Sequence, residues 1–491
     1  MKKLICICLA LSILTGLLAS CGISETSSNT DSEETVSDTP TITEETEETE
    51  ETIGANLPKG LDLNGKSVRI KYQESDLFKF DVFLNEELNG ELISDALYNR
   101  NIRTEDDLNV KLEWIPRDDT GDWHLFPMEV QNEILAGADF TDLVIFESRW
   151  LVDMAVNGYF RDLSKLPYID LANPWWNGTL MKSLDFGEGR RYMLTGSNSL
   201  ATFVYSSAAL FNKDLFEMHF GDTNELYNLV EEHAWTLDKL LEYSSAAYVD
   251  NNGNNKWDVR DTVGCVTVGG VATSLARCAG LNYDTTDEEG NLAFDVYNEQ
   301  VLEMVDKLNK LFWSGEASLH QAWNYNISGH FAEGKALFLF QNLQAYASDQ
   351  MRSMENRYGV LPVPVLSEGM EYYSSTTPIV DFVPTTVPEN NLDVIAAVLE
   401  KLAFEGHTRV IPAWYEIALK NKMADDKRDS DMIDIIYSTL NMSKFCVIFP
   451  TYFYYVIEDQ ATGESYSSYY ASKQKSMLEE WDNILYPEKN E

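Results

Sequence analysis

Cysteine is scarce in this sequence, and its spacing argues against the usual cysteine-based sites. The 491 residues include six cysteines, of which only Cys21, Cys265, Cys278 and Cys446 follow the first twenty residues. None belongs to a CxxC pair or lies near a set of histidines, so no zinc or redox motif is indicated. Cys21 belongs to a separate motif at the amino terminus, and the odd number that remains argues against a disulfide framework. We expect buried side chains at these three positions, although one pair could form a disulfide.

Positive charge is also scarce. The chain has 37 Lys and Arg against 80 Asp and Glu, which gives a formal net charge of −43 at pH 7. A protein of this charge is repelled by nucleic acid and by anionic lipid surfaces. Neither is therefore an expected partner.

Motifs for covalent chemistry are missing. The sequence contains no GxSxG, no Walker A sequence and no HExxH, and its six histidines are scattered. A pair of carboxylates could be nominated as a glycosidase site almost anywhere in so acidic a chain, so their abundance carries no weight. The sequence gives little support for an enzyme.

The amino terminus has the pattern of a secretory signal. Met1-Lys2-Lys3 precedes an apolar segment that ends near Ala19, and this segment is shorter than the roughly 20 apolar residues of a membrane span. Small residues stand directly before Cys21, as in the bacterial lipobox, in which the cysteine receives a lipid. We therefore predict a lipoprotein signal peptide over residues 1–20 and lipidation of Cys21. A secreted protein with a chance cysteine at the cleavage point is the alternative.

An acidic segment follows the cysteine. Residues 22–58 contain eleven Asp or Glu, no Lys or Arg, and many Ser and Thr. Such a segment repels itself and has little to bury, so it stays extended and hydrated. We predict that residues 21–58 tether a folded body to the membrane through the lipid; an incidental low-complexity tail is the alternative.

The rest of the chain alternates between strand and helix patterns. Residues 67–73, 109–115 and 141–148 have the pattern of strands, and residues 91–108 and 127–138 have that of helices. A further strand is expected over 335–342, and further helices over 391–404 and 472–485. No later apolar segment is long enough to cross a bilayer. Strands that alternate with helices through short links are typical of an α/β protein.

Several segments of this body resemble one known family, in the order expected for it. They are ADFTDLVIFESRWLVDMAVNGYFRDLSKL at 138–166, FVYSSAALFNKDLFEMHF at 203–220, WTLDKLLEYS at 235–244, FAEGKALFLFQN at 331–342 and YGVLPVPV at 358–365. Together they resemble extracellular solute-binding proteins of the family 1 type, the lipoprotein receptors of carbohydrate ABC importers.

The resemblance implies a type II periplasmic-binding-protein fold. In this fold two α/β lobes are joined by crossing hinge strands, and the ligand lies in the cleft between them. The first lobe is expected over 59–200 plus 380–420, and the second over 203–378 plus 421–491.

Candidate ligand-binding residues lie where strands are expected to end. Open α/β sheets bind ligands beyond the carboxyl ends of their strands, and sugars stack on aromatic rings while their hydroxyls bond to polar side chains. The candidates are Glu147, Arg149 and Trp150 after the strand DLVIF, Gln341 and Asn342 after KALFLF, Ser197 with Asn198 before the first crossing, Asp381 beside the return, and the loop residues Trp175 and Trp323. A single Trp could equally be a core residue, and Trp176, next to Trp175, shares this ambiguity.

The segment DNNGNNKWDVRD has the spacing of a calcium loop. Oxygen ligands are expected from Asp250, Asn252, Asn254, the Lys256 carbonyl, Asp258 and Asp261, at positions 1, 3, 5, 7, 9 and 12. Position 6 is Asn255 instead of Gly, and position 12 is Asp instead of Glu. The sequence predicts a structural Ca²⁺, with an Asn-rich surface turn as the alternative.

These observations together favour a monomeric substrate-binding lipoprotein outside the cytoplasm, anchored to the bacterial cell membrane. We expect it to capture a carbohydrate, preferably an oligosaccharide, by closure of its lobes and to present it to ABC permease subunits. The alternatives are a surface-anchored glycoside hydrolase and a binding protein that serves a sensor or adhesion, and the ligand could be a peptide.

Overall fold

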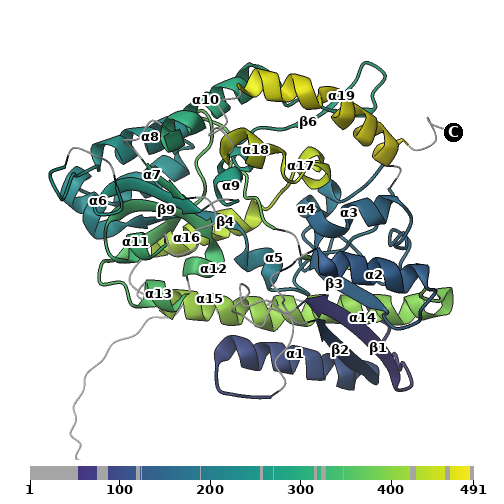
Figure 1. Cartoon of the computed structure of the whole chain (residues 1–491). Helices are drawn as coiled ribbons and strands as arrows, with labels where there is room; N and C mark the ends of the chain where they lie inside the picture. The colour runs from purple at the N-terminus through teal and green to yellow at the C-terminus, as the bar shows by residue number, and fades with distance from the viewer. Residues whose placement is uncertain are drawn as a thin grey trace, which may run out of the picture. The chain divides into compact units, whose positions relative to one another are not determined.

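The computed structural model describes residues 54–73, 87–117, 122, 124–187, 189–254, 258–268, 270–313, 318–321, 328–346, 348–377, 379–420, 427–458 and 465–486. Residues Gly54–Glu491 form one compact unit (Figure 1). The signal peptide, Cys21 and nearly all of the tether lie outside the described residues, as do Lys256 and Trp323. No helix in the described ranges has the length and apolar character needed to span a bilayer.

The first sheet contains four strands in the order β11-β3-β1-β2, namely β1 (Lys66–Gln73), β2 (Val110–Arg117), β3 (Leu143–Glu147) and β11 (Ile379–Phe382). β1 pairs in parallel with β2 and β3, whereas β11 runs antiparallel to β3. Every residue of β3 is buried, as its unbroken apolar run predicts for a strand covered on both faces. The helices of this first lobe are α1 (Leu92–Leu108), α2 (Leu125–Leu135), α3 (Ser148–Val156), α4 (Gly178–Ser183) and α14 (Leu392–Glu405), the last after the 3₁₀ turn η2 (Glu389–Asn391).

The second sheet contains five strands in the order β10-β4-β9-β5-β8, namely β4 (Ser207–Asn212), β5 (Val263–Val268), β8 (Ser318–Gln321), β9 (Ala336–Asn342) and β10 (Tyr358–Leu361). β5 is parallel to both of its neighbours, and β4 is antiparallel to both of its own. The helices of this second lobe are α6 (Lys213–Phe220), α7 (Asn224–Glu231), α8 (Leu237–Ala246), α9 (Ala272–Arg277), α10 (Glu299–Trp313), α11 (Ser328–Ala332), α12 (Leu343–Tyr346), α13 (Asp349–Arg352) and α16 (Lys427–Ser438). A separate hairpin joins β6 (Asp284–Thr286) and β7 (Leu292–Phe294).

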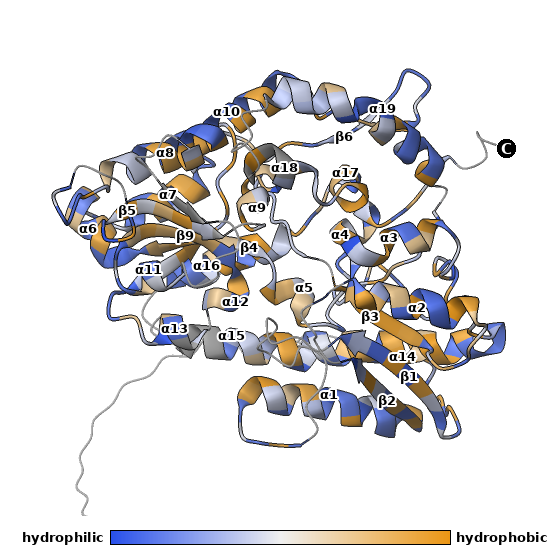
Figure 2. Cartoon of the chain, viewed as in Figure 1, coloured by the Kyte–Doolittle hydropathy of each residue, from blue (hydrophilic) through white to orange (hydrophobic). Residues whose placement is uncertain are grey.

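Each sheet has an antiparallel strand that enters from the other lobe. β4 follows directly from the first lobe, through the short helix α5 (Ala201–Val204), and β11 returns to the first sheet after the second lobe is complete. Figure 2 shows hydrophobic strands such as β3 and β9 at the centre of each lobe. The predicted α/β fold with two lobes and crossing strands is confirmed.

Three crossing segments lie side by side between the lobes. The hydroxyl of Thr195 donates to the carbonyl of Ile379 over 2.8 Å, and that of Thr376 donates to the carbonyl of Thr202 over 2.9 Å. Thr195 and Thr202 belong to the first segment, and Ser374, Thr376 and Ile379 belong to the second. The third segment carries Leu440, which forms a β-bridge with Ser374. The crossing region is therefore held by backbone and hydroxyl hydrogen bonds.

A continuous helical stretch reinforces this region. α14 passes through one π-helical turn, η3 (Gly406–Val410), into α15 (Ile411–Lys420) (Figure 1). A Cβ on Gly406 would overlap the carbonyl oxygen of Ser197, so only glycine permits this close approach.

The carboxyl-terminal helices are α17 (Lys444–Ile448), α18 (Tyr452–Glu458) and α19 (Tyr466–Leu485). α17 contacts α3 of the first lobe, and α18 contacts α9 of the second. The Asp284 carboxylate of β6 accepts the backbone N–H groups of Lys444 and Phe445, at 2.7 and 2.9 Å. The Lys444 ammonium donates to the Ser183 carbonyl in the first lobe over 3.3 Å, and burial lowers its pKa. This terminal segment therefore links the two lobes at a second place, apart from the crossing segments.

Candidate functional site

The carboxyl end of β3 carries a charged and aromatic cluster, which we call the β3-end cluster: Glu147, Arg149 and Trp150. Glu147 is 5% exposed and accepts a hydrogen bond from Nε of Arg149. The Arg149 guanidinium carbon lies 5.3 Å from the centroid of the Trp150 ring, in a cation–π arrangement. The structure thus brings together the three residues that the sequence placed after this strand.

Trp150 is half-buried and has an unused donor. The His124 ring meets it edge-on, with 4.7 Å between centroids and an interplanar angle of 86°. Its indole N–H is buried and has no hydrogen-bond partner among the described residues. A buried donor without a partner costs free energy, which a bound acceptor would recover.

Arg277 brings a second guanidinium to this cluster from the other lobe. It ends α9, the helix that follows β5, and it interacts electrostatically with both Arg149 and Glu147. Burial lowers its pKa, and the neighbouring Arg149 adds to this effect. Arg277 was not among the residues predicted from the sequence, although its place after β5 parallels that of Arg149 after β3.

Gln341 and Asn342 end β9 in the second sheet, as predicted. They pair with Ala208 and Ser207 of β4, and both are half-buried. The Gln341 side-chain oxygen accepts the backbone N–H of Asn342 over 3.1 Å. Their proposed contact with ligand stays a prediction.

Ser197, Asn198 and Asp381 lie in the crossing segments and are buried. The Asn198 amide donates to Asp381 over 2.5 Å, and its carbonyl accepts from Arg100 over 2.7 Å. Burial raises the pKa of Asp381 to about 7, against the opposing effects of Asn198 and Arg100. Asp381 is 1% exposed, so in this conformation its carboxyl belongs to the interior of the crossing region.

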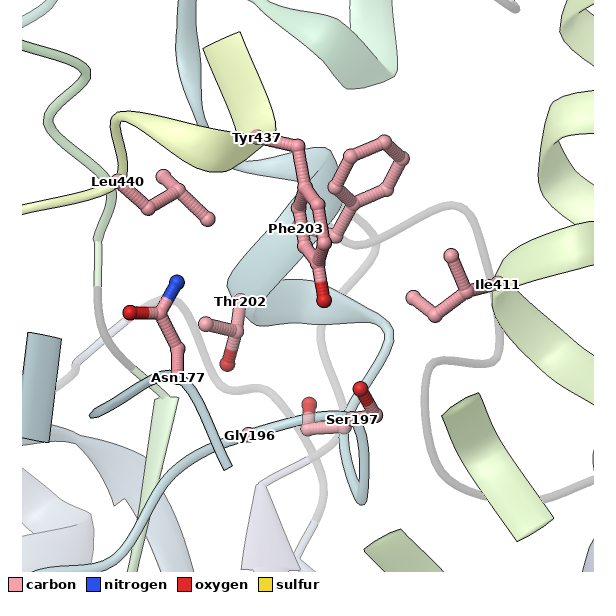
Figure 3. Close-up of a pocket in the computed structure, with 9 residues that line it drawn as sticks. Asn177, Gly196, Ser197, Thr202, Phe203, Ile411, Tyr437 and Leu440 are labelled. Carbon is pink, nitrogen blue, oxygen red and sulfur yellow. The ribbon is translucent and has the colours of Figure 1, made fainter. Parts of the chain in front are cut away.

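A pocket with an empty volume of about 230 Å³, part of it open to solvent, lies among these crossing segments (Figure 3). It is lined by Asn177, Gly196, Ser197, Ser199, Thr202, Phe203, Ile411, Tyr437 and Leu440. The Tyr437 hydroxyl points toward the segment that carries Ser197, and burial raises the pKa of Tyr437. Ligand pockets usually measure about 300–1,000 Å³, so this pocket is too small for an oligosaccharide.

Trp175 and Trp176 lie in the core of the first lobe. They are 2% and 1% exposed, and their indole N–H groups donate to the two oxygens of Glu400 over 3.1 and 2.8 Å. Glu400 also accepts the backbone N–H of Asn56 over 2.9 Å, and burial raises its pKa. In this conformation Trp175 has no free face for a sugar; its contact with ligand stays a prediction. Glu400 could not be identified from the sequence, because it lies in an apolar helix pattern far along the chain.

The predicted calcium loop uses its acidic groups for internal hydrogen bonds. The Asp261 carboxylate is buried and accepts from the Asp258 backbone N–H over 2.9 Å and from the Asn252 amide over 3.0 Å. Asp258 is bound by Arg260 Nε over 2.9 Å, and this contact lowers its pKa. No group of three acidic, His or Cys side chains suited to a metal occurs among the described residues. Calcium binding stays a prediction.

Cys265, Cys278 and Cys446 are all free and buried, so the disulfide left open by the sequence is not formed. Burial raises the pKa of the Cys446 thiol to about 11 and that of Cys278 to about 12. Both thiols therefore stay protonated at neutral pH.

Comparison with known proteins gives similarity of structure only. No protein-family profile matches the sequence, and no curated protein matches it. Among solved structures, the GacH receptor of Streptomyces glaucescens GLA.O is 13% identical with a TM-score of 0.53, over 86% of this chain and 99% of the receptor. An ABC transporter solute-binding protein of Thermotoga lettingae TMO is 13% identical with a TM-score of 0.53, over 86% of this chain and 100% of that protein's chain. UgpB of Mycobacterium tuberculosis is 14% identical with a TM-score of 0.53, over 79% of this chain and 95% of the UgpB chain.

These three structures cover both lobes of the chain, and all three are nearly fully matched. The chain therefore has the two-lobed α/β fold of solute-binding proteins.

Proposed function

We propose that this protein is the substrate-binding component of an ABC importer and that its ligand is a carbohydrate, preferably an oligosaccharide. The structures with a similar fold were solved with acarbose, α-D-tagatose and glycerophosphocholine, and two of these three ligands are sugars or sugar analogues. The fold permits many functions, so the proposal depends on the side chains at the strand ends.

The observation that carries the proposal is the half-buried β3-end cluster. It combines the half-buried ring of Trp150, the partly exposed guanidinium of Arg149 and an indole N–H without a partner, at the carboxyl end of a central strand. Stacking faces combined with charged donors suit sugars, which present apolar ring faces and acceptor hydroxyls.

In this proposal the protein's work is conformational. Ligand contacts from both lobes favour a closed arrangement over an open one, and the ligand shifts the population by its preference for the closed state. The three crossing segments form the hinge, and a permease would recognise the closed form. No covalent step is required.

The proposed location is outside the cytoplasm, on the bacterial cell membrane. A lipid on Cys21 would anchor the chain, and the acidic tether would hold the folded body away from a surface that repels its charge of −43. The protein would act as a monomer. Metabolic labelling with a radioactive fatty acid, compared between the wild type and Cys21→Ala, tests this part: only the wild type should take up label.

Isothermal titration calorimetry against a panel of oligosaccharides tests the proposed function. We expect saturable 1:1 binding, with each glycan recovered unchanged by chromatography after overnight incubation. Recovery of shortened glycan would instead indicate a glycoside hydrolase, and a panel without any binder would contradict carbohydrate capture.

A further inference from the structure

Arg277 is a half-buried cation whose charge is only partly compensated. It donates to the backbone carbonyl of Pro450, and no carboxylate among the described residues forms an ion pair with it. The charges that act on it include the like charge of Arg149 and the opposite charge of Glu147. Arg149 and Arg277 thus share the single carboxylate of Glu147, which leaves part of their positive charge uncompensated.

Arg149 is only partly used by the protein. Its Nε donates to Glu147, and no partner is found for its two terminal nitrogens within the described part of the chain. The side chain is 43% exposed and lies against Trp150. The flat guanidinium thus presents the edge that binds carboxylates through two parallel hydrogen bonds.

The local balance of charge is opposite to that of the whole protein. Arg149 and Arg277 contribute two positive charges, and Glu147 contributes one negative charge, whereas the chain carries −43. The unpartnered N–H of Trp150 adds one more donor. The cluster therefore has more donors and more positive charge than its own acceptors satisfy.

We infer that the ligand carries an anionic group, and specifically that this site binds the carboxylate of a uronic-acid-containing carbohydrate between Arg149 and Arg277. The inference rests on the proposed function and adds the class of sugar. One arginine comes from each lobe, so the carboxylate would also link the two lobes in the closed state. A neutral sugar could contact Trp150 but would leave the net positive charge of Arg149, Arg277 and Glu147 uncompensated.

Sulfate esters share the charge but differ in geometry. A carboxylate is planar and matches the fork of a guanidinium, whereas a sulfate is tetrahedral. We therefore expect uronate to bind more tightly than sulfate on sugars of equal length.

The test is a calorimetric comparison of matched oligosaccharides with the full chain. Oligogalacturonides and glucuronic-acid-substituted xylo-oligosaccharides are each paired with their neutral methyl esters, and sulfated oligosaccharides form a third arm. We expect at least one uronate to bind about 10- to 100-fold more tightly than its ester, the range for a charge-assisted pair of hydrogen bonds. Its affinity should fall with added NaCl, while that of any neutral sugar should not.

Two variants test whether Arg277 is responsible for the preference for uronate over its ester. Arg277→Gln keeps a donor for the Pro450 carbonyl but removes the charge, and it should abolish the preference for uronate over ester. Arg357→Gln is the matched control, because Arg357 is an exposed arginine of the second lobe that pairs with Asp214 and Glu217. It should bind as the wild type does.

The outcomes separate the two claims. Equal or tighter binding of the methyl esters would overturn the anionic ligand and leave carbohydrate capture standing. Preference for sulfated sugars over uronates would overturn the claim that the site selects a carboxylate group. Absence of binding to every sugar would overturn both the inference and the proposed function. The salt dependence is measured on the wild type, so it remains decisive if Arg277→Gln fails to fold.

Discussion

Two clusters of the first lobe contain tryptophan, but their indole N–H groups differ in whether they have a hydrogen-bond partner. Trp175 and Trp176 donate both of their indole N–H groups to Glu400, which also holds the backbone of Asn56. In the β3-end cluster, Trp150 has a buried N–H without a partner. A saturated cluster stabilises the fold, whereas an unsaturated cluster has capacity left for a ligand.

The sequence alone could not separate these clusters. Trp150 follows an expected strand and Trp175 lies in an expected loop, and either could be a core residue or a ligand contact. The contrast depends on Glu400, which is more than two hundred residues away along the chain. Hydrogen-bond partners at such separations are set by tertiary packing, which leaves no local signal. The same is true of Arg277, whose charged neighbours come from the other lobe.

The largest expected effect is the loss of the saturated acceptor. Glu400→Ala removes three hydrogen bonds and leaves two buried indole N–H groups without partners. We expect the free energy of unfolding to fall by about 3–5 kcal/mol, measured by urea denaturation. Glu368→Ala, at an exposed carboxylate, is the control and should change it by less than about 0.5 kcal/mol. Equal losses of unfolding free energy in Glu400→Ala and Glu368→Ala would mean that the hydrogen bonds of Glu400 do not stabilise the fold.

Asp381 is a third case, a buried carboxyl with one amide partner. Its pKa of about 7 in the folded state exceeds the ordinary value of 3.8 because of burial. Between these values the native state keeps a proton that the unfolded state has released, so stability is greatest at low pH and falls as pH rises. At about 1.4 kcal/mol per pH unit, the loss by pH 8 is about 4 kcal/mol.

Asp381→Asn removes this titration and keeps an oxygen that accepts from Asn198. We expect its advantage over the wild type to grow between pH 4.5 and pH 8 in urea denaturation experiments. Parallel pH profiles of the two proteins would show that Asp381 does not hold a proton in the folded state.

Matched ring substitutions compare the two clusters directly. Trp176→Phe loses a hydrogen bond to a buried carboxylate and should cost about 2–3 kcal/mol of unfolding free energy. Trp150→Phe loses an N–H that has no partner, so it should cost less than about 1 kcal/mol. In calorimetry it should nevertheless weaken sugar binding by about 5- to 10-fold. The comparison fails if Trp150→Phe is the more destabilising of the two.

The smallest expected effect concerns the Asn-rich loop. If Ca²⁺ binds there, millimolar CaCl₂ should raise the Tm of the wild type by a few degrees and leave Asp250→Ala unchanged. Differential scanning fluorimetry with MgCl₂ as the control measures this shift. An equal response of both proteins would rule out a site that uses Asp250.

Much of the fold could be predicted because its signals are local. Residues 67–73 and 335–342 were expected as strands and lie within β1 and within one residue of β9, and the helix expected over 391–404 corresponds to α14. Asn212 and Thr236 cap α6 and α8 with their side chains, which explains why the segments FNKDLFE and WTLDKLLE mark helix starts. The helix expected over 472–485 begins earlier, at Tyr466, because Ser465 caps it. The hydrogen bonds of the crossing region and the terminal link between the lobes involve distant partners and could not be predicted.

The most direct test of the account uses fluorine NMR on protein that contains 5-fluorotryptophan. The Trp150, Trp175 and Trp176 resonances are assigned by single Trp→Phe variants and followed during titration with a sugar that binds in calorimetry. The account predicts that the Trp150 signal shifts to saturation at one equivalent, while the signals of Trp175 and Trp176 barely move. A titration that shifts Trp175 or Trp176 and leaves Trp150 unchanged would contradict it.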